Sequence, residues 1–218
     1  MKISVNDCPL CLDSNTQEYS QDKFRCYFIC SNCELVYVPR HQLISMKDER
    51  ARYEHHQNIV EDPGYLSYLS KIEQDCEPHL KKGDFGLDFG CGPSPLLGNI
   101  FSERGFATNS YDLFFNPYLE YQKSNYDFII LSEVIEHLRN PYDIMLELKG
   151  LLKSKGIIFI KTKLYPEKDL FHDWFYKRDL THIQFFSEAS LHSLAQNLDM
   201  KFIGKVGSDL YLLRNNLL

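Results

Sequence analysis

The chain has 218 residues, of which 44% are hydrophobic and 25% are charged, and its formal net charge is −6. This size and composition are typical of a globular protein with one main core, and no apolar run is long enough to cross a membrane. The acidic balance argues against a protein whose main ligand is a nucleic-acid backbone, because such proteins usually carry a basic face. The N-terminal MKISVNDCPLC lacks the apolar stretch of a secretory signal, so we expect a cytoplasmic protein.

Two cysteine pairs at the start of the chain predict a metal site. Cys8 and Cys11 form one C-x-x-C pair, and Cys30 and Cys33 form the second. Each pair can present two thiolates from one tight turn, and four thiolates make the tetrahedral set that Zn²⁺ prefers. Because the segment between the pairs reads as short strands, residues 1–40 are predicted to form a small zinc ribbon that holds structural zinc. Buried free thiols or a redox pair are the alternative, with Cys26 as a rival ligand.

A polar, charged stretch at residues 41–62 favours helix and predicts a helical connector. The main domain is then expected at residues 63–218. Its first helical pattern follows Pro63-Gly64 and places Leu66, Leu69, Ile72 and Cys76 on one stripe.

From Gly83 onward, predicted strands and helices alternate along the chain. Apolar runs predict buried parallel strands at 85–89, 106–111, 126–131 and 157–162, and a helix is expected at 95–104. Asn140 is predicted to cap a further helix that begins at Pro141, and Ser187 is predicted to cap another. Two strand-like runs around VGSD near the C-terminus predict a hairpin. The pattern therefore predicts a doubly wound α/β sheet that ends in an antiparallel strand.

The stretch GLDFGCGPS at 86–94 lies at the carboxyl end of the first strand, where such sheets bind ligands. Pro95 stands where a dinucleotide fingerprint needs its third glycine, and no Gly-Lys-Ser/Thr is present, so pyrophosphate is disfavoured. Asp88 would repel phosphate but suits a cationic ligand such as S-adenosylmethionine. Asp112 ends the next strand, where its carboxylate can accept hydrogen bonds from both ribose hydroxyls. A bare structural turn is the alternative.

Together with YDLF at 111–114, YDFIILSEVIEHLRNP at 126–141 and LLKSKGIIFIKT at 151–162, this turn resembles the class I S-adenosylmethionine-dependent methyltransferases. The resemblance runs from about Tyr65 to the C-terminus and implies a Rossmann-like, seven-stranded sheet whose last strand is antiparallel. It implies a donor site formed by Asp88, Gly90, Cys91, Gly92, Asp112, Leu113, Ser132 and Glu133.

One segment departs from the family pattern. The chain from Asp112 to Tyr126 is shorter than the family's usual helix and strand, so no adenine-contacting acid is assigned. Leu113 and Phe114 are expected to form an apolar adenine wall instead. The combination of a zinc module with a methyltransferase domain also resembles some sugar C-methyltransferases.

The segment FHDWFYKRDLTHIQFF at 171–186 follows a strand end and is dense in aromatic and titratable side chains, which predicts a substrate lid. It resembles a W-x-Y-x-x-D-x-T-H pattern of one bacterial branch of the family. His137 and His182 are candidate general bases because imidazole titrates near neutral pH, and Tyr176 and Asp179 are further catalytic candidates. Alternatively, the aromatic side chains only pack the segment, Asp179 and His182 bond to backbone, and His137 caps or packs its helix.

The sequence therefore predicts an S-adenosylmethionine-dependent methyltransferase that carries structural zinc and acts on a small-molecule acceptor, with a sugar derivative as one candidate. No nucleic-acid or membrane partner is expected. Two alternatives stay open: an RNA methyltransferase whose zinc module holds nucleic acid, and a non-catalytic S-adenosylmethionine-binding module. The sequence specifies neither the acceptor nor the oligomeric state.

Overall fold

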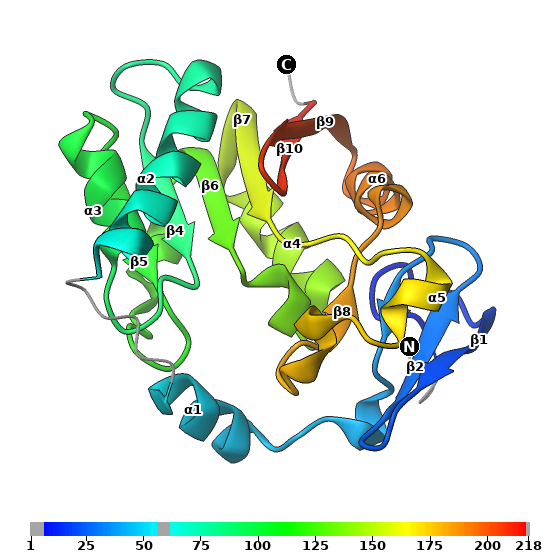
Figure 1. Ribbon diagram of the computed structural model, residues 1–218. Helices are drawn as coiled ribbons and strands as arrows, with labels where there is room; N and C mark the ends of the chain where they lie inside the picture. Colours follow the sequence, from blue (N-terminus) through cyan, green and yellow to red (C-terminus); the bar gives the residue numbers. More distant parts are fainter. Residues whose placement is uncertain (1–6, 56–61, 217–218) are drawn as a thin grey trace.

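The computed structural model describes residues 7–55 and 62–216, and its main feature is a six-stranded sheet in the order β5-β4-β6-β7-β10-β9 (Figure 1). The strands are β4 (Gly86–Phe89), β5 (Thr108–Tyr111), β6 (Tyr126–Ser132), β7 (Leu152–Lys161), β9 (Met200–Gly207) and β10 (Leu210–Asn215). Strands β5, β4, β6 and β7 run parallel to one another, whereas β10 is antiparallel to both β7 and β9. The predicted Rossmann-like fold with an antiparallel last strand is therefore confirmed.

The strand count is the one correction to the predicted sheet. Six strands, not seven, form the main sheet within the described residues. The short segment between Asp112 and Tyr126 contains the 3₁₀ helix Leu119–Lys123 but no strand of this sheet. A crossover with its own helix and strand needs many more residues than this segment has, so the sheet ends at β5.

Helices cover both faces of the main sheet because its central strands alternate apolar side chains between two cores. One core joins Phe128, Ile130 and Phe159 to α2 (Pro63–Cys76) and α3 (Leu96–Glu103). The other joins Ile129, Leu131 and Ile160 to α4 (Pro141–Gly150) and α6 (Glu188–Asn197). The carboxyl ends of β4, β5 and β6 stay open between these layers.

Three helix details test the predicted signals. The Ser187 cap of α6 is confirmed, because its side chain accepts from the Ser190 amide at 3.1 Å. Asn140 precedes α4 as predicted, but its side-chain oxygen accepts from Arg40 at 2.7 Å and caps no helix amide. Leu66 of the predicted α2 stripe is exposed, whereas Leu69, Ile72 and Cys76 are buried.

The N-terminal residues form a second, four-stranded sheet in the order β1-β2-β3-β8. Its strands are β1 (Thr16–Gln21), β2 (Cys26–Cys30), β3 (Val36–Tyr37) and β8 (Gln184–Phe185). The first three belong to the predicted zinc ribbon, but β8 comes from the predicted lid segment and pairs antiparallel with β3. In Figure 1 this sheet and α5 (Lys168–Phe171) lie beside α6, at one end of the molecule.

The predicted connector contains α1 (Met46–His55), and residues 56–61 of it lie outside the described residues. Figure 1 shows α1 beneath the open edge of the main sheet, between the N-terminal sheet and α2. Among the described helices, none combines the length and the apolar character that a membrane span requires.

Candidate active site

The glycine turn after β4 holds its shape through left-handed backbone angles. Gly90 has φ +86° and Gly92 has φ +67°, values that side chains disfavour. The Gly90 and Cys91 amides both donate to the Tyr111 carbonyl, at 2.7 and 3.0 Å. A Cβ on Gly90 would lie 2.4 Å from Val134 Cγ2. Glycine at position 90 therefore lets the turn pass directly beneath the loop after β6.

A cavity of about 620 Å³ opens at the carboxyl ends of β4, β5 and β6. Most of the predicted site residues line it: Gly90, Cys91, Gly92, Asp112, Leu113, Ser132, Glu133, His137, Asp179 and His182. The sequence also predicted Phe114 in its wall, and Phe114 does line the cavity. Residues from four separate chain segments thus share one cavity, as the predicted meeting of strand ends requires.

Asp112 organises the glycine turn from the end of β5. Its Oδ2 accepts from the Gly92 amide at 2.9 Å, and its Oδ1 accepts from the Phe114 and Phe115 amides at 2.8 and 3.1 Å. An ionised carboxylate offers about four acceptor positions, so three are used by backbone and the carboxylate still lines the cavity. The predicted contact with a ribose hydroxyl fits this position, although a pair of such contacts would have to share acceptors with the turn.

Asp88 does not take the position that the sequence predicted. Its side chain is 3% exposed, accepts from the Gly98 amide of α3 at 3.2 Å and does not line the cavity. Burial, with the nearby charge of Asp112, raises the pKa of Asp88 to about 7. Asp88 therefore supports the first turn of α3 behind the glycine turn, because its side chain points into the core and not toward a ligand.

Tyr176 is also displaced from its predicted role as a catalytic group. Its side chain is 5% exposed, it does not line the cavity, and its hydroxyl donates to Glu133 Oε2 at 2.8 Å. The same hydroxyl lies in a very short contact with Glu136 Oε1. Burial and the charges of Glu136 and Glu133 raise the pKa of Tyr176, so the phenol stays protonated and positions two carboxylates.

Glu133 and Glu136 belong to the loop that follows β6. Glu133 has φ +54° and lines the cavity, whereas Glu136 is fully buried in the 3₁₀ helix Ile135–His137. Burial and the charge of Glu133 raise the pKa of Glu136 to about 8. A non-glycine residue held at positive φ is typical of functional loops, and here it directs Glu133 into the cavity.

His137 and His182 lie together at the other side of the cavity, with ring centroids 4.6 Å apart. His137 Nδ1 lies 3.0 Å from the Thr181 carbonyl, and His182 Nδ1 lies 2.6 Å from the Tyr176 carbonyl. Because a carbonyl only accepts, each Nδ1 donates, and the neutral ring then carries its lone pair on Nε2. Burial lowers the pKa of His182, which favours that neutral form at pH 7.

Asp179 completes this side of the cavity. Its Oδ1 accepts from the Thr181 amide at 2.9 Å and from the Thr181 hydroxyl at 2.7 Å. Burial opposes ionisation of Asp179, but the Thr181 hydrogen bonds outweigh it and lower the pKa of Asp179. Asp179 is therefore a fixed negative charge near the two histidines.

The four predicted metal-ligating cysteines form one cluster. All four sulfur atoms lie within 4.8 Å of one another, with Cys8 and Cys33 at 3.5 Å and Cys11 and Cys30 also at 3.5 Å. Tetrahedral zinc with Zn–S bonds of 2.3 Å places sulfur atoms about 3.8 Å apart, so this donor set fits the ion. Leu12 and Glu34, the residues after each pair, have φ +62° and +59°. Cys26 lies outside the cluster on β2.

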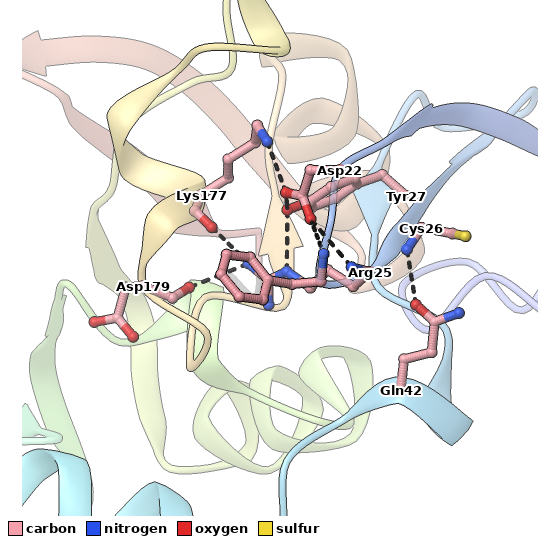
Figure 2. A network of polar contacts seen from close by, with 8 residues as sticks. Asp22, Arg25, Cys26, Tyr27, Gln42, Lys177 and Asp179 are labelled. Carbon is pink, nitrogen blue, oxygen red and sulfur yellow. Dashed lines mark hydrogen bonds and ion pairs between the residues drawn. The ribbon is translucent and has the colours of Figure 1, made fainter.

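A buried arginine ties the N-terminal sheet to the segment that carries Tyr176 and His182. Figure 2 shows Arg25 reaching the carbonyls of Lys177 and Asp179, at 2.8 and 3.1 Å, and a further bond of 3.1 Å goes to the Leu180 carbonyl. In the same network Lys177 forms a 2.8 Å ion pair with Asp22. Burial works against the ionised Asp22 carboxylate, but the hydrogen bonds from Lys177, from the Tyr27 hydroxyl and from two backbone amides together lower the pKa of Asp22.

A family model described as a methyltransferase domain matches residues 55–203, which is most of the chain. The chain belongs to this methyltransferase family. The resemblance to class I S-adenosylmethionine-dependent methyltransferases, and with it the predicted enzyme class, is thereby confirmed.

Solved methyltransferase structures share the fold at low sequence identity. The 1,6-didemethyltoxoflavin-N1-methyltransferase of Burkholderia thailandensis, solved with 1,6-didemethyltoxoflavin and S-adenosylhomocysteine, has a TM-score of 0.58 and 13% identity, over 91% of this chain and 99% of that one. An O-methyltransferase family protein of the same organism has a TM-score of 0.52 and 11% identity, over 76% of this chain and 61% of that one. No curated protein sequence matched the chain.

Several residues at the methyltransferase cavity had no sequence signal. Tyr53 of α1 and Tyr65 and Tyr68 of α2 line it, as does Arg139, which donates to Glu49 at 2.9 Å and to the Ile44 carbonyl at 2.7 Å. Glu136 was visible only as part of a family motif. The three tyrosines belong to no sequence motif, so only the placement of α1 and α2 beside the strand ends reveals them as cavity walls.

Proposed function

We propose that this methyltransferase binds S-adenosylmethionine along the glycine turn and transfers its methyl group to a small molecule that enters beside His137 and His182. One observation carries the proposal: the glycine turn with Asp112 and the histidine pair with Asp179 line the same cavity. Its volume of about 620 Å³ lies within the range of small-molecule sites.

The charges of the cavity favour this donor. Among the described lining residues, Arg139 is the one lysine or arginine. Five acidic side chains also line the cavity: Glu49, Asp112, Glu133, Asp143 and Asp179. A sulfonium and an ammonium group are both stabilised by such surroundings, whereas a phosphate backbone is repelled. The same charges disfavour the RNA methyltransferase alternative.

Methyl transfer from a sulfonium is an in-line displacement in which the protein mainly aligns the acceptor and excludes water. In the proposed complex, Asp112 orients the ribose and Leu113 and Phe114 form the adenine wall. Glu133 and Ser132 lie between donor and acceptor. His137 or His182 receives a proton if the acceptor must lose one, and Asp179 stabilises the charge that this creates.

The cysteine cluster is proposed to hold structural zinc. Four thiols this close cannot all ionise without a cation, and the hydrogen bond with Cys11 raises the pKa of Cys33. A bound Zn²⁺ deprotonates coordinating thiols and completes the small N-terminal core. The four cysteines supply four ligands, so the site keeps no open position for catalysis.

Calorimetry with S-adenosylmethionine tests the donor assignment. The change Asp112→Asn should weaken binding by about ten- to a hundredfold, because it replaces charge-assisted hydrogen bonds with neutral ones. The matched control Asp169→Asn alters an exposed carboxylate of α5 and should leave the affinity unchanged. Unchanged affinity in Asp112→Asn would refute the ribose contact.

Transfer of a labelled methyl group separates the candidate functions. A fraction of small metabolites should become labelled, whereas a total RNA preparation should not. Labelling of RNA alone would favour the RNA methyltransferase. Donor binding without transfer to either pool would favour the non-catalytic module.

A further inference from the structure

Three metal-ligating side chains meet beside the methyltransferase cavity, apart from the cysteine cluster. Glu136, His137 and His182 each offer a ligand atom, and these atoms lie within 4.8 Å of one another. A cation about 2.1 Å from each ligand would hold them roughly 3 to 3.5 Å apart, so small side-chain movements close the set. His137 and His182 also line the cavity.

Both imidazoles are held in the form that ligates metals. Each Nδ1 donates to a backbone carbonyl, that of Thr181 for His137 and that of Tyr176 for His182. Metal-ligating histidines almost always donate their other ring N–H in this way, because it fixes the tautomer and the ring orientation.

The carboxylates at this site lack a matching cation. Glu136 is fully buried, and its Oε2 has no hydrogen-bond partner among the described residues. The single hydroxyl proton of Tyr176 faces both Glu133 and Glu136. Within the described part of the chain, no lysine or arginine lies within ion-pair distance of either carboxylate. An uncompensated buried carboxylate is costly unless a proton or a metal neutralises it.

The geometry points to a second metal site, in which Glu136, His137 and His182 bind one divalent cation whose remaining positions face the cavity. Two imidazoles and one carboxylate suit Zn²⁺, Mn²⁺ or Fe²⁺, and three protein ligands leave room for a water or a substrate oxygen. Glu133 is connected to this site through the Tyr176 hydroxyl, which it shares with Glu136.

The cation defines the acceptor class, an inference that rests on the proposed function. A bound hydroxyl oxygen would lose its proton to water more readily, because a divalent cation stabilises the alkoxide. The oxygen lone pair then forms the O–C bond, and the S–C bond breaks with its electron pair left on sulfur, which yields a neutral thioether. The acceptor inferred from this site is a hydroxyl compound. With the cation bound, the two histidines are its ligands, and water takes over the proton-accepting role that His137 or His182 would have in the metal-free site.

Equilibrium dialysis of the full chain, with zinc already in the cysteine cluster, tests the site against Zn²⁺ and, separately, Mn²⁺. The wild type should bind one further equivalent of at least one of these ions. Glu136→Gln and His182→Ala should each lose that equivalent while they keep the first zinc. The matched control His192→Ala, an exposed histidine of α6, should keep both.

Electron-spin-echo spectra of bound Mn²⁺ detect direct ligation by imidazole nitrogen, which histidines with a purely structural role would not show. Coupling to imidazole nitrogen should appear in the wild type and decrease in His137→Gln and in His182→Ala. A wild type that takes up no further equivalent of either ion overturns the site, whether or not the variants fold. An extra equivalent that survives both Glu136→Gln and His182→Ala overturns it as well.

Donor calorimetry on the same samples separates the two proposals. Glu136→Gln should bind S-adenosylmethionine like the wild type, since Glu136 does not line the cavity. If the wild type fails to bind the donor, the proposed function fails. If it binds the donor but no second cation, only the metal site fails.

Discussion

Two glycines with left-handed backbone angles, Gly90 and Gly105, differ in how close the nearest side chain lies. At Gly90, the left-handed backbone and the closeness to Val134 both exclude a side chain. Gly105 has a similar φ of +95°, yet a Cβ there would meet nothing within 4 Å. A side chain at position 105 would therefore suffer backbone strain alone, whereas a side chain at position 90 would also clash with Val134.

Gly90→Ala should lower the free energy of unfolding by about 2–4 kcal/mol, the sum of left-handed strain and overpacking against Val134. Gly105→Ala should cost only about 1–2 kcal/mol, because strain alone acts there. Urea denaturation of both variants checks the difference. Adding Val134→Ala to Gly90→Ala should recover part of the loss, and equal losses at positions 90 and 105 would contradict the steric argument.

Asp88 makes stability depend on pH. Its pKa is about 7 in the folded protein, against about 3.9 in an unfolded chain. Between these values the folded state holds a proton that the unfolded state has released, so stability falls as pH rises from 4 to 7. Ionising a buried carboxylate with one backbone donor causes this loss.

Asp88→Asn should remove that part of the pH dependence. Relative to the wild type, the variant should gain roughly 2–4 kcal/mol of stability between pH 4 and pH 8. Denaturation of both proteins across this range measures the gain, and Glu136, present in both, cancels from the difference. A constant difference between the two proteins would show that Asp88 has an ordinary pKa.

Among the elements, β8 links the N-terminal sheet to the loop that follows β6. On one side β8 pairs with β3, and Val38 donates to the Ile183 carbonyl at 2.9 Å. On the other side the Ile183 amide donates to the Glu136 carbonyl at 2.9 Å. His182 directly precedes this segment, so the position of its ring depends on a strand that the cysteine cluster supports.

Removing the proposed zinc from the cysteine cluster, by chelation or by Cys30→Ser, should loosen β3 and then β8. Hydrogen exchange at the Val38 and Ile183 amides should accelerate at least tenfold, because both hydrogen bonds rest on this pairing. The Tyr126 amide, which donates to Leu151 in the main sheet, should be unaffected and serves as the control. Unchanged exchange at Val38 would argue against a structural ion.

In the whole molecule, the predicted zinc ribbon and the predicted main domain share a hydrophobic core. Tyr27, Val36 and Val38 from the N-terminal sheet pack against Phe171 and Phe185 of the main domain. Both phenylalanines are fully buried. Arg25 adds hydrogen bonds to the carbonyls of Lys177 and Asp179, which Figure 2 shows, and to the Leu180 carbonyl.

Deletion of residues 1–40 should therefore destabilise the rest of the chain. Exposing Phe171 and Phe185 alone removes about 3–6 kcal/mol of hydrophobic stabilisation, a large part of the stability of a typical domain. We expect a lower melting temperature, aggregation in size-exclusion chromatography and loss of methyl transfer. The control Phe24→Ser in the full chain changes a side chain that is 66% exposed and should alter none of these properties. A deletion variant that is folded and active would contradict the shared core.

Local patterns in the amino-acid sequence were enough to predict several features of this protein. Apolar runs placed β4, β6 and the C-terminal hairpin, two C-x-x-C pairs located the cysteine cluster, and the glycine turn located the cavity. These predictions succeed because periodicity, turn chemistry and ligand spacing act over a few residues.

The features that depend on contacts between distant segments are set by the tertiary fold. It turned Asp88 into the core, joined Tyr176 to Glu133 and Glu136, placed β8 in the N-terminal sheet and brought His137 beside His182. The burial and the hydrogen-bond partners of a side chain depend on how whole helices and strands pack together. The spacing of residues within one segment carries no information about that packing. The acidic and histidine residues of this site acquire their chemistry from the fold that encloses them.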